Sequence, residues 1–475
     1  MSQKPMHFTP RPHQQAMIEY MLGERRRLNV WMFMGGGKSS SALFSIHVAR
    51  SLLGDDAPTL VLAPKYVADV TWPDETQKWE QFKHMEVASI TGSEKNRLAA
   101  VKQDAAIHAV NYQNIPWLVE YWGAKWPYRR VIADESTRLK SHRAKQGGVR
   151  TQALAKVAFK YVSEWINLTG TPAPNGLLDL WGQQWFIDGG RRLGSSFSAF
   201  QDRWFQYDKY TNVYRPMPSA REEITALLSD CTLSLRIEDW FDLDEPIVTT
   251  VPVKLPPVAR KLYNKMEREL VASFNGRHIE AAIAMSRSAK CAQIASGAVL
   301  TNNEETGKPT GEFVEVHDAK LQALESLLDE MGGEPVIVSY HWQADLVRLK
   351  RAFKQGVSLA DAKDSKKVIR DWNAGKVPLL FLHPQSAGHG LNLQYGGRAL
   401  VFYSYGWGLE EHEQIIERIG PMRQKQAGLD RAVLLYYLTA EDTVEEDIKA
   451  RLADKADLQT AVSTAMARAT ARSGG

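Results

Sequence analysis

A short run of glycines, closed by a lysine and serines, follows an apolar segment near the start of the chain. The apolar segment is NVWMFM (29–34), and the run is Gly35, Gly36, Gly37, Lys38, Ser39 and Ser40. Glycines let the backbone curl so that successive N–H groups point at phosphate oxygens, and a helix beginning there adds positive potential. Lys38 would reach the outer phosphates, and the Ser39 hydroxyl would ligate Mg²⁺. The order of strand, glycine loop and helix predicts a phosphate-binding loop.

The loop departs from the strict pattern GxxxxGK[ST] at one position. Met32 stands where that pattern has its first glycine. The segment taken alone is therefore only moderately specific, and a glycine-rich turn beside a chance Lys-Ser pair is the alternative interpretation.

Two adjacent carboxylates end another apolar segment. The residues RRVIA (129–133) are followed by Asp134 and Glu135, and ligands bind at the carboxyl tips of parallel strands. Asp134 would hold Mg²⁺ through a water, while Glu135 would orient a water for attack on the γ-phosphate. A lone Asp-Glu pair after a strand is usually a cap or a surface pair. Its place about a hundred residues after a phosphate loop is what a P-loop ATPase requires, so the two motifs together predict ATP hydrolysis.

Short apolar segments alternate with helical patterns over two stretches of the chain, which predicts an α/β fold with two parallel-sheet lobes. The apolar segments lie at 29–34, 58–64, 105–112, 129–135 and 166–170, and again at 335–340, 377–384, 397–405 and 432–440. A chain of 475 residues also exceeds the usual size of one hydrophobic core. After residue 185 the alternation gives way to polar and helical patterns such as 257–274, which predicts a helical insertion.

The patterns divide the chain into four expected segments. They are an N-terminal ATP-binding lobe (1–185), a helical insertion with a linker (186–310), a C-terminal lobe (311–460) and a flexible tail (461–475). The stretch TNNEETGKPTGE (301–312) is rich in turn formers and charge, so it is expected to be an exposed linker into the second lobe.

Composition narrows the functional classes. The chain is 44% hydrophobic and 24% charged with a net charge of +4, which permits nucleic-acid binding without demanding it. Runs such as Arg25-Arg26-Arg27 could meet phosphates, but such runs are usually solvated faces. Cys231 and Cys291 lack the spacing of a zinc site or a disulfide framework. Neither a membrane span nor a signal peptide is recognisable, so a cytoplasmic protein is expected.

With these motifs placed, the chain resembles helicase superfamily 2 nearly end to end, and within it the Swi/Snf-type translocases of double-stranded DNA. The resemblance implies two RecA-like lobes. The segment PRPHQQAMI is similar to the family's opening segment, in which a glutamine, here Gln14, contacts adenine. Residues 59–79 resemble a strand and loop that lie against one DNA strand, with Pro64 and Lys65 at the strand tip.

The most specific match is the segment NLTGTP (167–172), which is very close to the family's third motif. That motif links the ATP site to the other lobe, and its residues here are Thr169, Gly170 and Thr171. Threonine hydroxyls suit the role because they can switch hydrogen-bond partners as the nucleotide changes.

The second stretch resembles the family's fifth and sixth motifs. The fifth is SAGHGLNL (386–393), whose phosphate-contacting positions are Ser386, Gly388, Gly390 and Asn392. In the sixth, Trp407 is followed by Gln414, Arg418 and Arg423. The resemblance implies that the two arginines meet the γ-phosphate across a cleft between the lobes.

Two positions differ from the family pattern, and one further position matches it in the helical protrusion. The family's second arginine falls on Pro421, and proline cannot stabilise phosphate charge, so either Arg423 replaces it through a shifted loop or Arg418 acts alone. We favour Arg423. Thr137 stands where the family more often has histidine after the acidic pair, which leaves hydrolysis intact but changes its coupling to DNA. Arg236 matches a basic position in the family's helical protrusion.

The resemblance implies a monomeric, ATP- and Mg²⁺-dependent motor of bacterial or phage type. It would hydrolyse ATP between the lobes and step along duplex or branched DNA by backbone contacts, with little sequence specificity. Two alternatives stay open. A strand-separating helicase would need a wedge that the sequence does not reveal, and a nucleotide-switched scaffold would bind ATP and DNA without translocating. A nuclease is disfavoured because no further clustered carboxylates follow the ATPase motifs.

Overall fold

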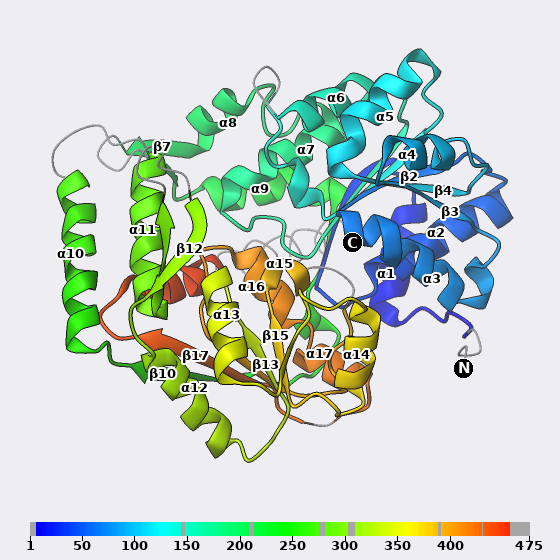
Figure 1. Cartoon of the computed structure of the whole chain (residues 1–475). Coiled ribbons are helices and arrows are strands. Elements are labelled where there is room, and N and C mark those ends of the chain that lie inside the picture. The colour runs from blue at the N-terminus through cyan, green and yellow to red at the C-terminus, as the bar shows by residue number, and fades with distance from the viewer. Residues whose placement is uncertain are drawn as a thin grey trace. The chain divides into compact units, whose positions relative to one another are not determined.

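The computed structural model describes residues 6–143, 148–208, 213–274, 281–302, 309–387, 391–429 and 431–456. Its contacts divide the chain into two compact units, with the boundaries at Asp242/Leu243 and at Asp454/Lys455 (Figure 1). Each unit contains one parallel β-sheet flanked by helices. The expected α/β fold with two parallel sheets is confirmed.

The first unit is built on a seven-stranded sheet in the order β3-β4-β2-β5-β6-β1-β9, and every neighbouring pair in it is parallel. Its strands are β1 (Arg27–Met32), β2 (Thr59–Ala63), β3 (Val87–Ile90), β4 (Ile107–Asn111), β5 (Arg130–Asp134), β6 (Glu164–Thr169) and β9 (Thr232–Leu235).

Its helices are α1 (Pro12–Leu22), α2 (Lys38–Leu53), α3 (Trp72–Lys78), α4 (Glu94–Ala100), α5 (Ile115–Trp122), α6 (Val149–Ala158), α7 (Leu180–Asp188), α8 (Phe197–Trp204) and α9 (Ala220–Leu228). Single turns η1 (Val67–Thr71), η3 (Tyr112–Asn114), η5 (Ser136–Leu139) and η8 (Ile237–Asp239), together with the hairpin β7 (Phe205–Asp208) and β8 (Val213–Pro216), complete the elements used below.

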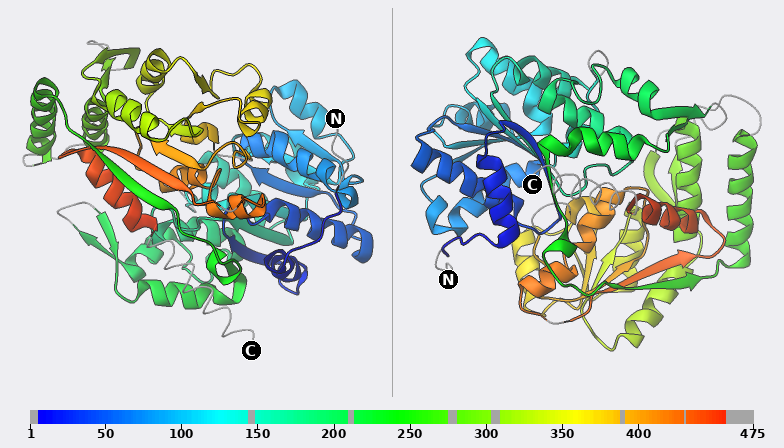
Figure 2. Two further views of the ribbon diagram at one scale, coloured as in Figure 1. Left: turned by 90° about the horizontal axis from the view of Figure 1, so that it is seen from below. Right: turned by 180° about the vertical axis from the view of Figure 1, so that it is seen from behind.

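Both faces of the first sheet are buried, as the uninterrupted apolar strands require. Along β2, Leu60 and Leu62 belong to one core, with residues of α5, α6 and α7, whereas Val61 and Ala63 belong to the other, with residues of α1, α2 and α3. This alternation is the period of two expected for a strand. Figures 1 and 2 show the two sets of helices on opposite faces of the sheet.

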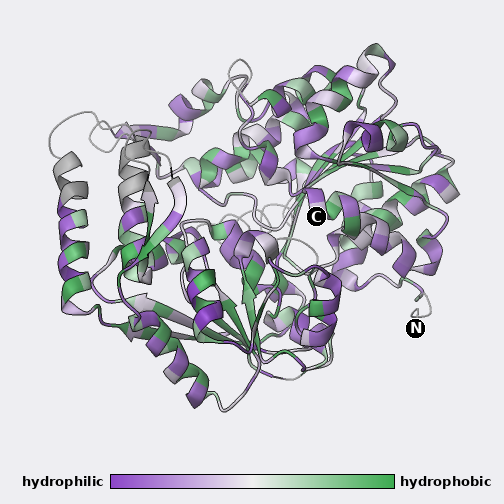
Figure 3. Cartoon of the chain, in the orientation of Figure 1, coloured by the Kyte–Doolittle hydropathy of each residue, from purple (hydrophilic) through white to green (hydrophobic). Residues whose placement is uncertain are grey.

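The second unit is built on a six-stranded parallel sheet in the order β10-β17-β16-β13-β15-β14. Its strands are β10 (Ile247–Val253), β13 (Val336–Ser339), β14 (Gly356–Ser358), β15 (Leu379–Leu382), β16 (Ala399–Phe402) and β17 (Leu434–Ala440). Its helices are α10 (Pro257–Phe274), α11 (Ala281–Ser296), α12 (Ala319–Glu330), α13 (Gln343–Ala352), α14 (Ser365–Asn373), α15 (Pro384–Ala387), α16 (Leu409–Ile416) and α17 (Pro421–Gln426). Figure 3 shows that the strands of both sheets are mainly hydrophobic (green), whereas hydrophobic and hydrophilic (purple) residues alternate along the helices.

The region expected to be a helical insertion contains strands as well as helices, including the hairpin of β7 and β8. Strand β9 pairs with β1 at the edge of the first sheet, and β10 pairs with β17 at the edge of the second. The described ends of the expected linker, 301–302 and 309–312, belong to two paired antiparallel strands, β11 (Ala298–Asn302) and β12 (Pro309–Glu315). Strand β9 has four residues and β10 is largely exposed, so their sequence pattern is weak and the neighbouring strand decides their state.

The expected tail, residues 461–475, lies outside the described residues. Within the described part of the chain, no helix has the length and apolar character needed to cross a membrane.

Candidate active site

The glycine loop joins β1 to α2 at the carboxyl edge of the first sheet. Gly35 and Gly37 have φ values of 74° and 86°, which favour glycine. Gly37 caps the amino end of α2, and Lys38 is the first residue of that helix. A Cβ atom on Gly37 would lie 2.2 Å from the side-chain nitrogen of Gln14. The conformation therefore favours glycine here, and a residue with a side chain would also have to displace the end of the Gln14 side chain.

The start of α1 supports this loop. Gln14 donates a hydrogen bond from Nε2 to the Gly36 carbonyl (3.2 Å) and accepts one at Oε1 from the Arg11 N–H (2.9 Å). A ring nitrogen of His13 lies 3.0 Å from the same Gly36 oxygen. Gln14 is thus placed against the glycine loop, and its contact with adenine stays a prediction.

Three consecutive serines open α2, and they differ in how their hydroxyls are used. Ser40 and Ser41 both donate to the Gly37 carbonyl, at 3.0 and 2.9 Å. The Ser39 hydroxyl forms no hydrogen bond with any described residue. Of the three, Ser39 is the one whose oxygen is available to a ligand.

The acidic pair lies at the tip of β5, as its sequence position predicted. Asp134 is buried, and its carboxylate accepts a hydrogen bond from the Trp72 indole at 3.1 Å. Burial raises the pKa of Asp134, and the nearby Lys38 ammonium opposes that rise. The loop lysine and the strand-tip carboxylate therefore occupy one site. Carboxylate and hydroxyl oxygens are the donors that Mg²⁺ prefers, so Asp134 and Ser39 fit this ion.

The neighbouring Glu135 has an unusual backbone. Its φ is 55°, one of two positive values among non-glycine residues of the described chain. The Tyr112 hydroxyl donates to the carbonyl of Asp134 at 2.9 Å and lies 3.4 Å from that of Glu135. Such backbone strain gathers at functional sites, and Tyr112 helps to hold this turn.

The third motif follows β6 and reaches the same site. A side chain on Gly170 would begin 3.5 Å from the Lys38 ammonium nitrogen. The Thr169 hydroxyl accepts a hydrogen bond from the Thr171 N–H at 3.1 Å. The hydroxyl of Thr171 is buried and has no hydrogen-bond partner among the described residues, which leaves it able to bond a group that arrives with the nucleotide.

A glutamine connects the second and third motifs. Gln183, on α7, accepts a hydrogen bond from the Ser136 hydroxyl at 2.9 Å and donates to the Pro172 carbonyl at 2.8 Å. Sequence reasoning did not single out Gln183, Tyr112 or the bond from Trp72 to Asp134. No local pattern marks these residues, because their partners are distant in sequence.

Other predicted residues of the first unit lie near strand ends. Pro64 and Lys65 follow β2, and Lys65 is exposed. Thr137 is buried in η5, and its hydroxyl has no hydrogen-bond partner in the described chain. Arg236 precedes η8 and is ion-paired with Asp239, so its charge is already compensated.

In the second unit, the structure joins the fifth and sixth motifs. Arg423, on α17, donates to the side-chain oxygen of Asn392 at 2.5 Å. Asn373 donates to the Asn392 carbonyl at 2.7 Å. Burial lowers the pKa of Arg423, and Glu417 opposes the effect. Ser386 lies exposed in α15, whereas Gly388 and Gly390 lie outside the described residues.

Pro421 is the first residue of α17. Proline suits that position because its fixed φ matches the helix and its missing N–H would be unpaired there. The proline that replaces an expected arginine therefore begins the helix that carries Arg423, two residues later.

Of the remaining residues of the sixth motif, Gln414 and Arg418 are buried, whereas Trp407 is 44% exposed. Gln414 donates to Glu410 at 3.3 Å within α16, and Arg418 follows this helix. Burial raises the pKa of Glu413 to about 8, and the carboxylates of Glu417 and Glu410 add to the rise.

The family is decided by a match to the SNF2-related domain over residues 13–299. The chain belongs to the SNF2 family. The resemblance to Swi/Snf-type ATPases is thereby confirmed, and with it the class of ATP-dependent enzymes that act on DNA.

Relatives of this SNF2 chain include a phage protein. The putative protein p41 of Acyrthosiphon pisum secondary endosymbiont phage 1 is 48% identical over 466 residues, which are 97% of this chain and 99% of p41. Uncharacterized ATP-dependent helicases of Mycoplasma genitalium and Mycoplasma pneumoniae are 22% and 24% identical over 87% and 90% of this chain. The chain spans 38% and 39% of those two helicases.

Among solved structures, the SWI2/SNF2 ATPase core of Sulfolobus solfataricus in complex with double-stranded DNA aligns with a TM-score of 0.43 and 19% identity, over 98% of this chain and 96% of that one.

Proposed function

We propose that this SNF2-family chain is a DNA-stimulated ATPase that moves along duplex or branched DNA with little sequence specificity. The observation that carries the proposal is the convergence of Lys38, Asp134 and Gly170 at one edge of the first sheet. These residues come from three separate motifs, and the family acts with ATP on DNA.

In the proposed mechanism, the backbone N–H groups of Gly35 to Gly37 and the Lys38 ammonium hold the phosphates of ATP. Ser39 and Asp134 would hold Mg²⁺, which neutralises charge on the β- and γ-phosphates when bound. Glu135 orients a water for in-line attack on the γ-phosphate. Tyr112 supports this step because it fixes the turn from which Glu135 projects.

The second unit would contribute arginines to the same nucleotide. Arg418 and Arg423 would approach the γ-phosphate when the units close, and arginine stabilises the charge that develops there. The bond between Arg423 and Asn392 ties this arginine to the fifth motif, so a change at the nucleotide would pass to a loop proposed to contact DNA.

The DNA contacts in this proposal involve the strand-tip residues Pro64 and Lys65 and the fifth-motif residues Ser386, Gly388, Gly390 and Asn392. Contacts of this kind reach phosphates and carry no sequence information. The Thr171 hydroxyl would report the state of the γ-phosphate, and Gln183 would pass that state between the second and third motifs. Alternate closing and opening of the two units would then produce a step along the backbone.

The test is steady-state ATP hydrolysis without nucleic acid and with single-stranded, duplex or branched DNA. We expect duplex or branched DNA to stimulate turnover strongly, and Lys38→Ala and Glu135→Gln each to lower it by at least about 100-fold. Exposed Lys95→Ala, on α4, is the matched control and should retain wild-type turnover. Absence of turnover on every DNA would contradict the proposal.

A nucleotide-switched scaffold is the second candidate, and Pro421 in place of an arginine is the observation that favours it. It predicts ATP binding with negligible hydrolysis, which the same assay separates from the motor. A strand-displacement assay then distinguishes translocation on duplex DNA from strand separation.

A further inference from the structure

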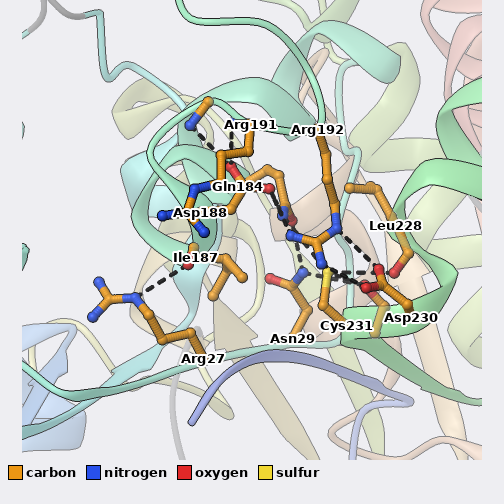
Figure 4. A network of polar contacts seen from close by, with 12 residues as sticks. Arg27, Asn29, Gln184, Ile187, Asp188, Arg191, Arg192, Leu228, Asp230 and Cys231 are labelled. Carbon is orange, nitrogen blue, oxygen red and sulfur yellow. Dashed lines mark hydrogen bonds and ion pairs between the residues drawn. The ribbon is translucent and has the colours of Figure 1, made fainter. Parts of the chain in front are cut away.

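An arginine-rich pocket lies in the first unit, apart from the candidate active site. Its volume is about 600 Å³, and Arg25, Arg26, Arg27, Arg191 and Arg192 line it. Figure 4 shows Arg27, Arg191 and Arg192 gathered around the carboxyl end of α7. None of these arginines belongs to the motifs used above.

The pocket lies at the amino edge of the first sheet, opposite the glycine loop. Arg27 is the first residue of β1, and the loop begins after its last residue. Ser163, which also lines the pocket, precedes β6, whose far end leads to the third motif. A strand of this length spans about 17 Å, so one ligand in the pocket would not also touch the nucleotide loop.

On the inner wall of the pocket, the partial negative charges of four backbone carbonyl oxygens are compensated by the guanidinium group of Arg27. Arg27 donates to four carbonyls, those of Ala158, Val162, Phe186 and Ile187, at 2.8 to 3.1 Å. Two of these carbonyls end α7 and one ends α6, where the helix dipoles are negative. Arg27 therefore removes the negative potential that would otherwise repel an anion from the pocket.

Ion pairs neutralise the nearby acidic side chains. Arg192 pairs with Asp188 at 3.0 Å and with Asp230 at 2.6 Å, and Arg25 also pairs with Asp230 at 3.2 Å. Arg26 pairs with Glu164 at 2.8 Å. Glu164 and Asp55 further share Arg130, and Asp55 pairs with Arg129.

Positive charge is left over after these pairings. The pocket and its ion-pair network contain seven arginines and four carboxylates. Arg27 and Arg191 form no ion pair with any carboxylate that the structure describes, and Arg191 is exposed. The side chain of Arg26 is 65% exposed. Such an excess repels itself unless an anion is bound.

The size and walls of the pocket indicate the class of anion. A volume of about 600 Å³ exceeds that of a single phosphate ion, and the exposed guanidinium groups come from two separate segments of the chain. Phe159 adds an apolar wall and is 46% exposed. Guanidinium forks suit successive phosphates, and an apolar ring suits a sugar or a base.

We propose that this pocket is an accessory binding site for the phosphodiester backbone of DNA, with Arg26 and Arg191 as the residues that meet phosphates. This proposal rests on the proposed function only because it takes DNA as the ligand. A contact on the edge opposite the strand tips would keep a DNA segment attached while the contacts at the active edge are released.

The test is equilibrium binding of the full chain to DNA by fluorescence anisotropy, without nucleotide and at several salt concentrations. For the double variant Arg26→Ala/Arg191→Ala we expect binding about 10-fold weaker and a salt dependence less steep by about 1 to 2 in the log–log slope. The Arg26 side chain is exposed and Glu164 keeps its ion pair with Arg130, so stability should change little.

The matched control is Lys95→Ala/Lys102→Ala, which removes two exposed positive charges elsewhere in the first unit. Blunt duplex and a single-stranded oligonucleotide form separate arms, and the arm that loses affinity identifies the form of DNA that the pocket holds. If the arginine variant matches the control on both arms, the proposal is overturned and an acidic protein segment becomes the candidate ligand. ATP turnover at saturating DNA should be unchanged in the arginine variant. Failure of the proposed function would instead appear as absence of DNA-stimulated turnover in the wild-type chain.

Discussion

Three side chains at opposite edges of the first sheet, those of Ser39 and Thr171 at one edge and of Arg27 at the other, differ in how far their hydrogen bonds are satisfied. At the carboxyl edge, the hydroxyls of Ser39 and Thr171 have no partner within the described residues. At the amino edge, Arg27 donates to four carbonyls. Since buried polar groups are nearly always paired, the buried and unpaired hydroxyl of Thr171 indicates a place for a ligand, and the saturated arginine indicates a structural role. The comparison predicts that changes at the first edge impair turnover and that changes at the second impair stability.

The largest expected effect extends the comparison to the second unit. Arg423→Ala should lower DNA-stimulated ATP turnover by about 1000-fold, because an arginine at the γ-phosphate stabilises the transition state. Arg431 is the contrasting residue, since it donates to Gln424 and to the carbonyls of Gln394 and Gly397. Arg431→Met should mainly lower the melting temperature. Equal turnover in wild type and Arg423→Ala would instead assign the phosphate contact to Arg418 alone.

The next effect concerns the glycine loop. Gly37→Ala should lower kcat/KM for ATP by about 100-fold, because the new methyl group displaces the loop against Gln14. Gly54→Ala is the matched control: Gly54 also has positive φ, at the other end of α2, with nothing within 4 Å of a Cβ atom. It should cost about 1 kcal/mol of stability and leave turnover intact. A similar loss of turnover in both variants would point to helix strain rather than loop geometry.

The third effect tests the amino edge. Arg27→Met should lower the free energy of unfolding of the first unit by about 3 kcal/mol, because buried carbonyls lose their donors. Burial already lowers the pKa of Arg27 to about 10, as expected for a cation held inside the fold. Chemical denaturation measures the change, and Arg191→Met, exposed in the same pocket, serves as the control. Wild-type stability in Arg27→Met would remove the contrast between the edges.

The smallest effect concerns an exception to the comparison. His142 is buried among Trp181, Trp185 and Phe186, and neither ring nitrogen has a partner among the described residues. Burial lowers its pKa to about 4, and Arg143 adds to the effect. The folded protein therefore favours the neutral ring, and this stability is present above pH 6.5 and is lost as the pH falls towards 4.

The corresponding variant is His142→Phe. Between pH 7.5 and pH 5, the free energy of unfolding of the wild type should fall by about 2 kcal/mol more than that of the variant. Turnover at pH 7.5 should be unchanged, since no ligand is expected at this ring. Denaturant titrations at the two pH values measure the difference, and exposed His7→Gln should retain the wild-type pH dependence. Identical pH dependence in His142→Phe and wild type would show that the ring is not kept neutral.

Much of the fold could be predicted from the sequence because the central strands are uninterrupted runs of buried and mainly apolar residues. Strands β1, β2, β4, β5 and β6, and later β13, β15, β16 and β17, lie where the apolar segments indicated. Strands β3, β9, β10 and β14 escaped notice, because they are short or half exposed and become strands only beside a neighbour. The division of the chain differs for the same reason: the region between the expected lobes supplies an edge strand to each sheet.

The candidate site shows the same division between local and distant information. The types and spacing of the glycines, the lysine, the serines and the acidic pair could be recognised in the sequence, because a proposed site for phosphate and Mg²⁺ admits few residue types. Which of three serines is available, however, depends on the hydrogen bonds that Ser40 and Ser41 make to Gly37. The roles of Trp72 and Gln183 depend on contacts between residues far apart in the chain.

By itself, the sequence determined the family and the two parallel sheets and located the glycine loop and the acidic pair, because each is encoded in a contiguous pattern. The tertiary structure alone decided which polar groups are saturated and which are open. It brought Arg423 to Asn392 and gathered arginines from separate segments into one pocket. The physical reason is that a hydrogen bond or an ion pair depends on distance in space, and distance in space is set only when the chain has packed.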